Sequence, residues 1–159
     1  MITVVETPED MTQLMRECVE ATHACIAKAN GLFGLHLPKF RVNFALKSTT
    51  AGKARLGRGI IEYNPTLLRE NPELFLQRTV GHEVIHFAAF AKFNDAGHGY
   101  HWKKMMRMMG LPDTRCHNYD VTRVPSMVGK VRNKSSSQGF RCDDGVVKMV
   151  GLGKIIEFD

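Results

Sequence analysis

Two histidines and a glutamate form the segment of this sequence with the clearest chemical meaning. Residues 79–86 contain the pattern His-Glu-x-x-His, which consists of His82, Glu83 and His86. In a helix, residues four apart lie on nearly the same face, so both imidazoles can bind one zinc ion. Glu83 can then serve as a base toward water that the metal activates. The pattern therefore predicts a zinc site built on a helix.

A third protein ligand is needed, because a catalytic zinc has four ligand positions and keeps one of them for water. The candidates are His98, His101, Asp95 or an acid elsewhere in the chain. We favour His98, since Gly97 and Gly99 on its two sides allow the backbone to turn sharply toward the first two histidines. His101 would require the following helix to run directly at the metal. Asp95 would give a site of two histidines and one aspartate.

The groups around this site have expected roles in amide hydrolysis. Glu83 would take a proton from the attacking water and pass it to the leaving amine, while the metal polarises the carbonyl group. A further donor to the developing oxyanion is usual, and Tyr100 is the nearest candidate. The alternative is that Tyr100 is a packed or surface residue. If His101 is not a ligand, we expect it to support the site, to contact substrate or to lie on the surface.

Two helices must hold these side chains. Asn71-Pro72-Glu73 is a helix-start signal, and the residues from Pro72 to the break at Asn94 are apolar on most sides, which predicts a buried helix. Burying the three polar side chains of the motif without partners would cost several kcal/mol, and a bound metal removes this objection. A second amphipathic helix is expected from Tyr100 to Met109.

The rest of the chain predicts one α+β domain with a small appendage. Its 159 residues, 43% of them hydrophobic, are enough for one core. Thr7-Pro8 begins an N-terminal amphipathic helix that is expected to end at Asn30-Gly31. Residues 139–159 are expected to form a small C-terminal β-meander. Three short strands are expected to form a small meander on the helix, in a mixed or antiparallel sheet: residues 41–46, 53–56 and 60–63.

The charge distribution favours a polyanionic partner. The net charge is +6, and residues 97–134 carry eight basic residues against two acidic ones. A basic segment beside a catalytic site favours nucleic acid, and the alternative is a solvated basic face. The candidate nucleic-acid-binding residues are Lys103, Lys104, Arg107, Arg123, Lys130, Arg132, Lys134 and Arg141.

The compartment is expected to be intracellular. The first residues contain no signal-peptide pattern, and no apolar run is long enough to span a bilayer. Four scattered cysteines are too few for a disulfide framework. We expect a monomer in the cytoplasm, at the nucleoid or in the nucleus, without a membrane partner.

The sequence from about Gly59 to Val121 resembles the SprT-like family, which includes the Spartan-type DNA-dependent proteases. The Gly-His-Gly-x-x-Trp segment, whose histidine lies twelve residues beyond His86, makes the resemblance specific. It implies a small zincin-like α+β fold, one catalytic Zn²⁺ held by the two motif histidines and His98, and Glu83 as the catalytic base. The segments that carry it are Ile61-Glu62-Tyr63-Asn64-Pro65, His82-Glu83-Val84-Ile85-His86, Gly97-His98-Gly99 with Trp102-Lys103, and Arg115-Cys116-His117-Asn118-Tyr119.

The resemblance also divides the chain, and at one point the chain departs from it. Residues 1–124 correspond to the metalloprotease core, 125–138 to a basic Ser- and Gly-rich linker, and 139–159 to a degenerate ribbon-like tail. Many family members carry a zinc ribbon with paired Cys-x-x-Cys motifs after the core. Here the tail contains Cys142 alone, and Cys116 lies upstream. Four-cysteine ligation is therefore not available, and we expect no second, structural zinc.

The function expected from these observations is a zinc-dependent metalloprotease that cleaves DNA-associated or DNA-crosslinked proteins. Its partners would be protein substrates and DNA, either single-stranded or double-stranded. One alternative is a nucleic-acid-binding module with a structural zinc, although a structural zinc has no need of Glu83. The other alternative is a zinc peptidase with a substrate unrelated to DNA.

Overall fold

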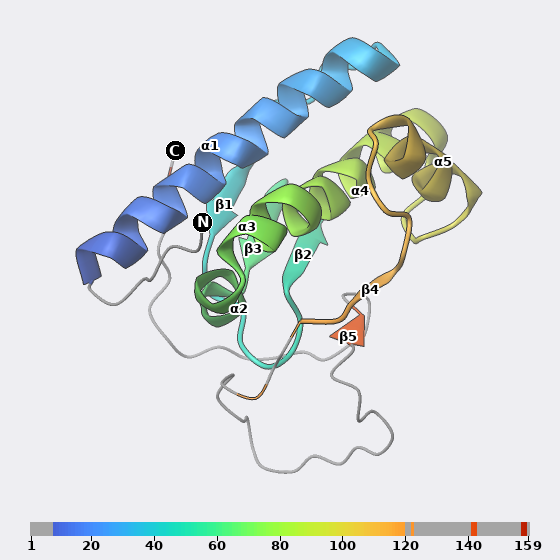
Figure 1. Cartoon of the computed structure of the whole chain (residues 1–159). Coiled ribbons are helices and arrows are strands. Elements are labelled where there is room, and N and C mark those ends of the chain that lie inside the picture. Colours follow the sequence, from blue (N-terminus) through green and yellow to red (C-terminus); the bar gives the residue numbers. More distant parts are fainter. Residues whose placement is uncertain (1–7, 120–121, 123–140, 143–156, 159) are drawn as a thin grey trace.

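A computed structural model places the chain in two layers, with helices packed on one face of a small sheet (Figure 1). The structure describes residues 8–119, 122, 141–142 and 157–158. The expected α+β architecture is confirmed: an N-terminal helix, a mixed sheet, a long helix that carries the histidine pair, and a following helix. The linker 125–138 and most of the tail lie outside the described residues.

The N-terminal helix α1 (Pro8–Phe33) is longer than the sequence predicts. Its expected end at Asn30-Gly31 is wrong. Gly34 instead adopts a left-handed φ of 67° directly after the helix, as a C-terminal glycine does. The side chain of Asn30 has another use, since it donates to the Leu37 carbonyl and accepts from the Leu37 amide at 3.0 and 2.8 Å. It thus holds the loop that leads into the sheet.

The sheet has the order β2-β3-β1-β6, made by β1 (Arg41–Asn43), β2 (Gly52–Arg55), β3 (Ile60–Tyr63) and β6 (Glu157–Phe158). β2 and β3 form an antiparallel hairpin, but β1 pairs with β3 in parallel. The expected meander of these three strands is therefore wrong. The loop from β1 crosses to the far edge before β2 begins.

The reason for this crossing lies at Asn64. Its side-chain amide donates to the carbonyls of Ser48 and Thr50 at 2.9 and 3.1 Å, which fixes the crossing loop beside the end of β3. Its side-chain oxygen also caps α2 (Pro65–Glu70). One asparagine therefore joins the loop, the sheet and a helix.

The central helix begins at Pro72, as predicted, but it is not uniform. A short α3 (Pro72–Leu74) leads into a π-helical segment η1 (Phe75–Thr79), and α4 (Val80–Phe93) follows without a break. α4 packs between α1, β2 and the next helix α5 (Tyr100–Met108). Its buried residues face these neighbours on most sides. The motif His-Glu-x-x-His lies in its first half.

The last described elements fasten the C-terminal part of the chain to the core. β4 (Cys116–His117) pairs antiparallel with β5 (Arg141–Cys142), and β6 pairs antiparallel with β1. Cys116 is disulfide-bonded, which the scattered cysteines did not predict. The middle strand of the expected C-terminal meander lies outside the described residues. None of the described helices is long and apolar enough to cross a membrane.

Candidate metal centre

Three imidazoles converge at the sheet side of α4. The Nε2 atom of His98 lies 3.0 Å from Nε2 of His82 and 3.1 Å from Nε2 of His86. The ligand atoms of all three lie within 4.8 Å of one another, which makes them a group able to hold one metal ion. His86 is buried, whereas His82 and His98 are half-buried. The structure therefore brings together the three residues that the sequence singled out as ligands.

The local sequence explains how His98 returns to the helix. Asn94 ends α4 in the left-handed conformation, with φ 57° and ψ 32°. Asp95 then holds the turn, because its carboxylate accepts a hydrogen bond from the Gly97 amide at 3.2 Å. Gly99 is needed for space, since a Cβ there would lie 3.2 Å from the Asp95 carboxylate. The left-handed turn is thus at Asn94, and neither glycine beside His98 adopts a positive φ.

The donor set and its geometry fit zinc. Three histidines with a fourth position open are a common catalytic zinc arrangement. Tetrahedral nitrogen ligands at about 2.0–2.1 Å from zinc lie about 3.3 Å from one another. The two distances from His98, 3.0 and 3.1 Å, are close to that separation. Three ring nitrogens at this spacing repel one another through their lone pairs unless a proton or a cation lies among them. A metal ion is the natural occupant.

Glu83 lies beside these nitrogens at the bottom of the site. The residue is 1% exposed, and its Oε1 lies 4.0 Å from Nε2 of His82. Gly52 of β2 packs directly against it, because a Cβ on Gly52 would lie 2.9 Å from Cγ of Glu83 and 3.0 Å from Oε1. The carboxylate is therefore held between α4 and the edge strand, next to the position that a metal would take.

Trp102 forms the wall behind all three histidines. Its ring centroid lies 4.7 Å from that of His82, 5.5 Å from His86 and 4.6 Å from His98. Its indole N–H donates to the His82 carbonyl at 3.4 Å. The side chain is fully buried. By fixing the ring planes, Trp102 prepares the site for a metal before one binds.

The other candidate ligands and donors lie elsewhere. Asp95 caps the Gly97 turn, as described above. The His101 ring stacks on Phe93, with centroids 3.9 Å apart and an interplanar angle of 8°. Tyr100 is 65% exposed, with its ring against His101 and below the Lys104 ammonium group. The structure does not bring these three residues into the group formed by His82, His86 and His98.

A segment from α5 to β4 closes one side of the site. His117 and Tyr119 fasten it: Nε2 of His117 lies 2.7 Å from the Thr49 carbonyl, and the Tyr119 hydroxyl lies 2.9 Å from Oγ1 of Thr79. Nδ1 of His117 accepts from the Tyr119 amide at 3.0 Å, so Nε2 carries the proton and donates to Thr49. Burial raises the pKa of Tyr119, although the Thr79 hydrogen bond and the nearby Arg78 charge lower it.

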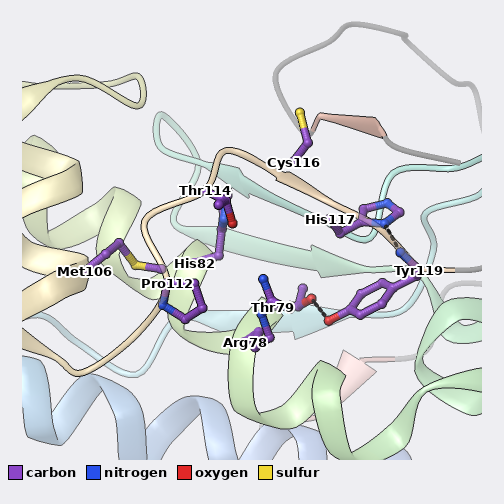
Figure 2. A pocket seen from close by; sticks show the side chains of 9 residues that line it. All are labelled: Arg78, Thr79, His82, Met106, Pro112, Thr114, Cys116, His117 and Tyr119. Carbon is purple, nitrogen blue, oxygen red and sulfur yellow. Dashed lines mark hydrogen bonds between the residues drawn. The ribbon is translucent and has the colours of Figure 1, made fainter. Parts of the chain in front are cut away.

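This segment encloses a pocket that borders the metal group (Figure 2). His82, Thr79, His117 and Tyr119 are among its lining residues. A second cavity adjoins it and is lined by Glu83 and Arg115 together with Gly52. Sequence reasoning did not assign Thr79, Arg78, His117 or Trp102 to the site. The available signals were the spacing of four between His98 and Trp102, and the Arg-Cys-His-Asn-Tyr segment, which had no assigned role.

The basic residues proposed to bind nucleic acid fall into three groups. Lys103 and Lys104 are exposed on α5, and Arg107 pairs with Asp113 at 2.7 Å. These three residues therefore lie on the helix that follows the loop of His98. Arg141 lies in β5, where only its backbone is described. The remaining candidates lie outside the described residues: Arg123, Lys130, Arg132 and Lys134.

The fold and the site together define a class of protein. It is an α+β protein in which a buried helix supplies His-Glu-x-x-His and the next loop supplies a third histidine. The sequence model of the SprT-like family matches residues 22–122, which is more than half of the chain. The chain therefore belongs to the SprT-like family.

Relatives named Protein SprT show the same relationship. The one from Pseudomonas putida (strain GB-1) is 40% identical over 116 residues, which are 71% of this chain and 69% of the relative. The one from Pseudomonas entomophila (strain L48) is 39% identical over the same shares. The one from Pseudomonas aeruginosa (strain LESB58) is 42% identical over 103 residues, 63% of this chain and 62% of the relative. No solved structure matches the chain.

Proposed function

We propose that this protein is a zinc metallopeptidase whose base is Glu83. The observation that carries the proposal is the placement of a 1% exposed carboxylate 4.0 Å from one of three converging imidazole nitrogens. A site that only held a structural ion would gain nothing from a buried acid beside its open position. Membership of the SprT-like family supports the same reading.

The residues of the chain have distinct tasks in this reaction. When bound, zinc supplies a Lewis acid and makes water a nucleophile at neutral pH. Glu83 takes the proton from the attacking water and transfers it to the amine that leaves. Gly52 packs against the Glu83 side chain and limits its movement, so that its oxygen stays aimed at the reacting atoms. Trp102 keeps the three ligand rings in place.

A peptide substrate would lie along β2. This strand is the edge of the sheet, and its residues line cavities on both sides of the histidine group. Gly52 borders the cavity at His82 and Glu83, while Ala54 borders the cavity at His86 and His98. An extended peptide can pair its backbone with an open strand edge. Pairing along β2 would therefore carry a peptide bond across the metal position.

Nucleic acid is the partner proposed for α5. The exposed Tyr100 and Phe93 lie close to lysine ammonium groups, each 5.9 Å from the ring: Lys104 over Tyr100 and Lys92 over Phe93. Aromatic rings beside cations are typical of surfaces on which single-stranded bases stack. Because Phe93 ends α4 and Tyr100 begins α5, the two rings flank the loop of His98, and DNA bound there would bring attached proteins close to the metal. DNA-associated proteins are thus the proposed substrates.

The direct test compares the parent protein with Glu83→Gln. Both are loaded with zinc and incubated with an unstructured protein, free or crosslinked to a single-stranded oligonucleotide, with and without a chelator. We expect equal zinc content, cleavage only by the parent, and faster cleavage of the crosslinked substrate. Cleavage by Glu83→Gln at the parent's rate would refute the assigned base. Equal DNA affinity of both proteins with no proteolysis by the parent would instead favour a nucleic-acid-binding module.

A matched variant separates the DNA part of the proposal from the peptidase part. Tyr100→Ala removes the most exposed ring of the surface. Leu74→Ala is the control, because it removes an exposed apolar side chain from α3, away from this surface; Leu74 is about as exposed as Phe93. We expect Tyr100→Ala alone to weaken oligonucleotide binding, by about 1–3 kcal/mol for one stacked base. Both variants should cleave the free protein as the parent does. Unchanged oligonucleotide binding by Tyr100→Ala would remove α5 from the DNA contact.

A further inference from the structure

Arg78 lies next to the three-histidine group and has no ion-pair or hydrogen-bond partner among the residues that the structure describes. It lies in η1, one turn before His82, and its side chain is half-buried. Within the described part of the chain, no side chain forms an ion pair or hydrogen bond with its guanidinium group. A half-buried arginine usually has an acidic partner, because partial removal from water weakens its hydration. The position of Arg78 therefore calls for an anion from outside the described chain.

The pocket around Arg78 opens toward the reacting centre. Arg78 and Thr79 line it from η1, His82 from the start of α4, and Met106 from α5, while the 112–119 segment covers it (Figure 2). The adjoining cavity shares Thr79 and His82 with this pocket and contains Glu83. The pocket around Arg78 therefore lies directly beside the cavity that contains Glu83.

Two arginines line the two cavities, one in each. Arg115 lines the adjoining cavity together with Glu83, so a second cation lies near the reacting centre. Arg78 and Tyr119 line the same pocket, and the Arg78 charge lowers the pKa of Tyr119 against the effect of burial. The remaining walls are apolar or neutral, and they include Met106 and Pro112. Such walls fit the stem of a short side chain, with a charged group at its end.

We propose that this pocket is a substrate subsite that binds the carboxylate of an aspartate or glutamate side chain, with Arg78 as its partner. The subsite rests on the proposed peptidase function and adds a substrate preference to it. Arginine presents paired N–H groups that match a carboxylate. A phosphodiester group fits less well, because sugars on both sides keep it from entering a recess, whereas a side-chain carboxylate stands at the end of a free stem.

The test uses peptides built on a cut site of the parent protein. The cut site is first located by mass spectrometry in an unstructured protein. Quenched fluorescent peptides with this site then carry Glu, Gln or Lys at each of the two positions before and the two positions after the cleaved bond. At one position we expect kcat/KM to be roughly 10- to 100-fold higher with Glu than with Gln, as a charged hydrogen-bonded pair provides. Arg78→Gln should equalise the Glu and Gln peptides. Arg78→Lys should keep part of the preference.

Two controls keep the subsite separate from general charge and from the peptidase proposal. Arg69→Gln removes a positive charge from α2, where Arg69 pairs with Glu70, and should leave the preference unchanged. Binding of the Glu and Gln peptides to zinc-loaded Glu83→Gln protein, measured by fluorescence anisotropy, reports the subsite without turnover. The same preference for Glu should appear there, and it should again depend on Arg78.

The possible results distinguish the subsite proposal from the peptidase proposal. Cleavage with no preference for Glu at any position, or with a preference that survives Arg78→Gln, overturns the subsite and leaves the peptidase proposal standing. Arg78-dependent binding of the Glu peptide without cleavage by the parent overturns the peptidase proposal and leaves the subsite. A single-stranded oligonucleotide should bind Arg78→Gln and parent equally. A tenfold loss of oligonucleotide affinity in Arg78→Gln would assign the pocket to phosphate and overturn the carboxylate proposal.

Discussion

Replacing Gly52 by alanine should disable the proposed base without removing the metal. Gly52 lies in β2, whose ladder with β3 fixes its backbone, and Glu83 lies in α4. The added Cβ would stand 2.9 Å from Cγ of Glu83, 3.0 Å from Oε1 and 3.1 Å from Cγ2 of Thr79. Carbon atoms prefer separations of about 3.5–4.0 Å, so the Glu83 side chain must move by roughly 0.6–1.1 Å.

The size of the expected effect follows from this displacement. A misplacement of about 1 Å at a catalytic group can reduce the rate by about 10²-fold. We therefore expect kcat to fall about 100-fold in Gly52→Ala, with KM little changed. Overpacking should also lower the free energy of unfolding by about 1–3 kcal/mol. Zinc content should stay the same, because the three atoms nearest the new Cβ belong to Glu83 and Thr79 and not to a histidine.

The assay measures kcat and KM on a fluorescent peptide, zinc content by mass spectrometry, and folding by circular dichroism. Gly57→Ala is the matched control, since it lies in the turn between β2 and β3 and a Cβ there meets nothing within 4 Å. It should behave as the parent. A folded, zinc-loaded Gly52→Ala protein with the parent's kcat would refute the reasoning, because Glu83 could then not be the group held against β2.

Three further predictions concern stability. Tyr63→Phe removes the buried hydrogen bond between the Tyr63 hydroxyl and Thr22, 2.8 Å long, and should cost about 1 kcal/mol in urea unfolding; an unchanged midpoint would contradict it. Gly31 lies inside α1, and a Cβ there would meet no neighbouring atom within 4 Å. Gly31→Ala should therefore raise the free energy of unfolding by about 0.4–1 kcal/mol, and a lower melting temperature would count against this prediction. Burial raises the pKa of Cys25 from 9.0 to about 11, so the folded state holds its proton longer and stability should fall between pH 9 and 11. Cys25→Ala should show a shallower fall, and an equal slope would exclude this thiol as a cause.

The helical part of the site could be predicted because it depends on local periodicity. The spacing of His82 and His86 places two imidazoles on one face of any helix. The third histidine could be proposed from the glycines on its two sides, and the structure places His98 with the other two. The turn itself differs from the prediction, which assigned it to the two glycines. Asn94 adopts the left-handed conformation, and Gly99 leaves room for the Asp95 side chain. Such details depend on side-chain contacts that a local pattern does not contain.

The contacts between distant segments could not be predicted. His117 reaches the Thr49 carbonyl across 68 residues, and Thr79 meets Tyr119 across 40. The parallel pairing of β1 with β3 arises from a loop that Asn64 holds. Alternation of apolar residues shows which face of a strand is buried, but it does not show which strand lies beside it. For the same reason, the sequence did not predict the pocket at Arg78, because residues 112–119 form part of its wall.

The most direct test of the central claim is X-ray absorption at the zinc edge of the zinc-loaded protein. A site held by His82, His86 and His98 predicts three imidazole nitrogens at about 2.0–2.1 Å and one further light ligand, the oxygen of a water molecule. His98→Ala should lose one imidazole shell, while His101→Ala should leave the spectrum unchanged. A sulfur shell at about 2.3 Å, a fourth imidazole, or a spectrum that changes in His101→Ala instead of His98→Ala would contradict the three-histidine site.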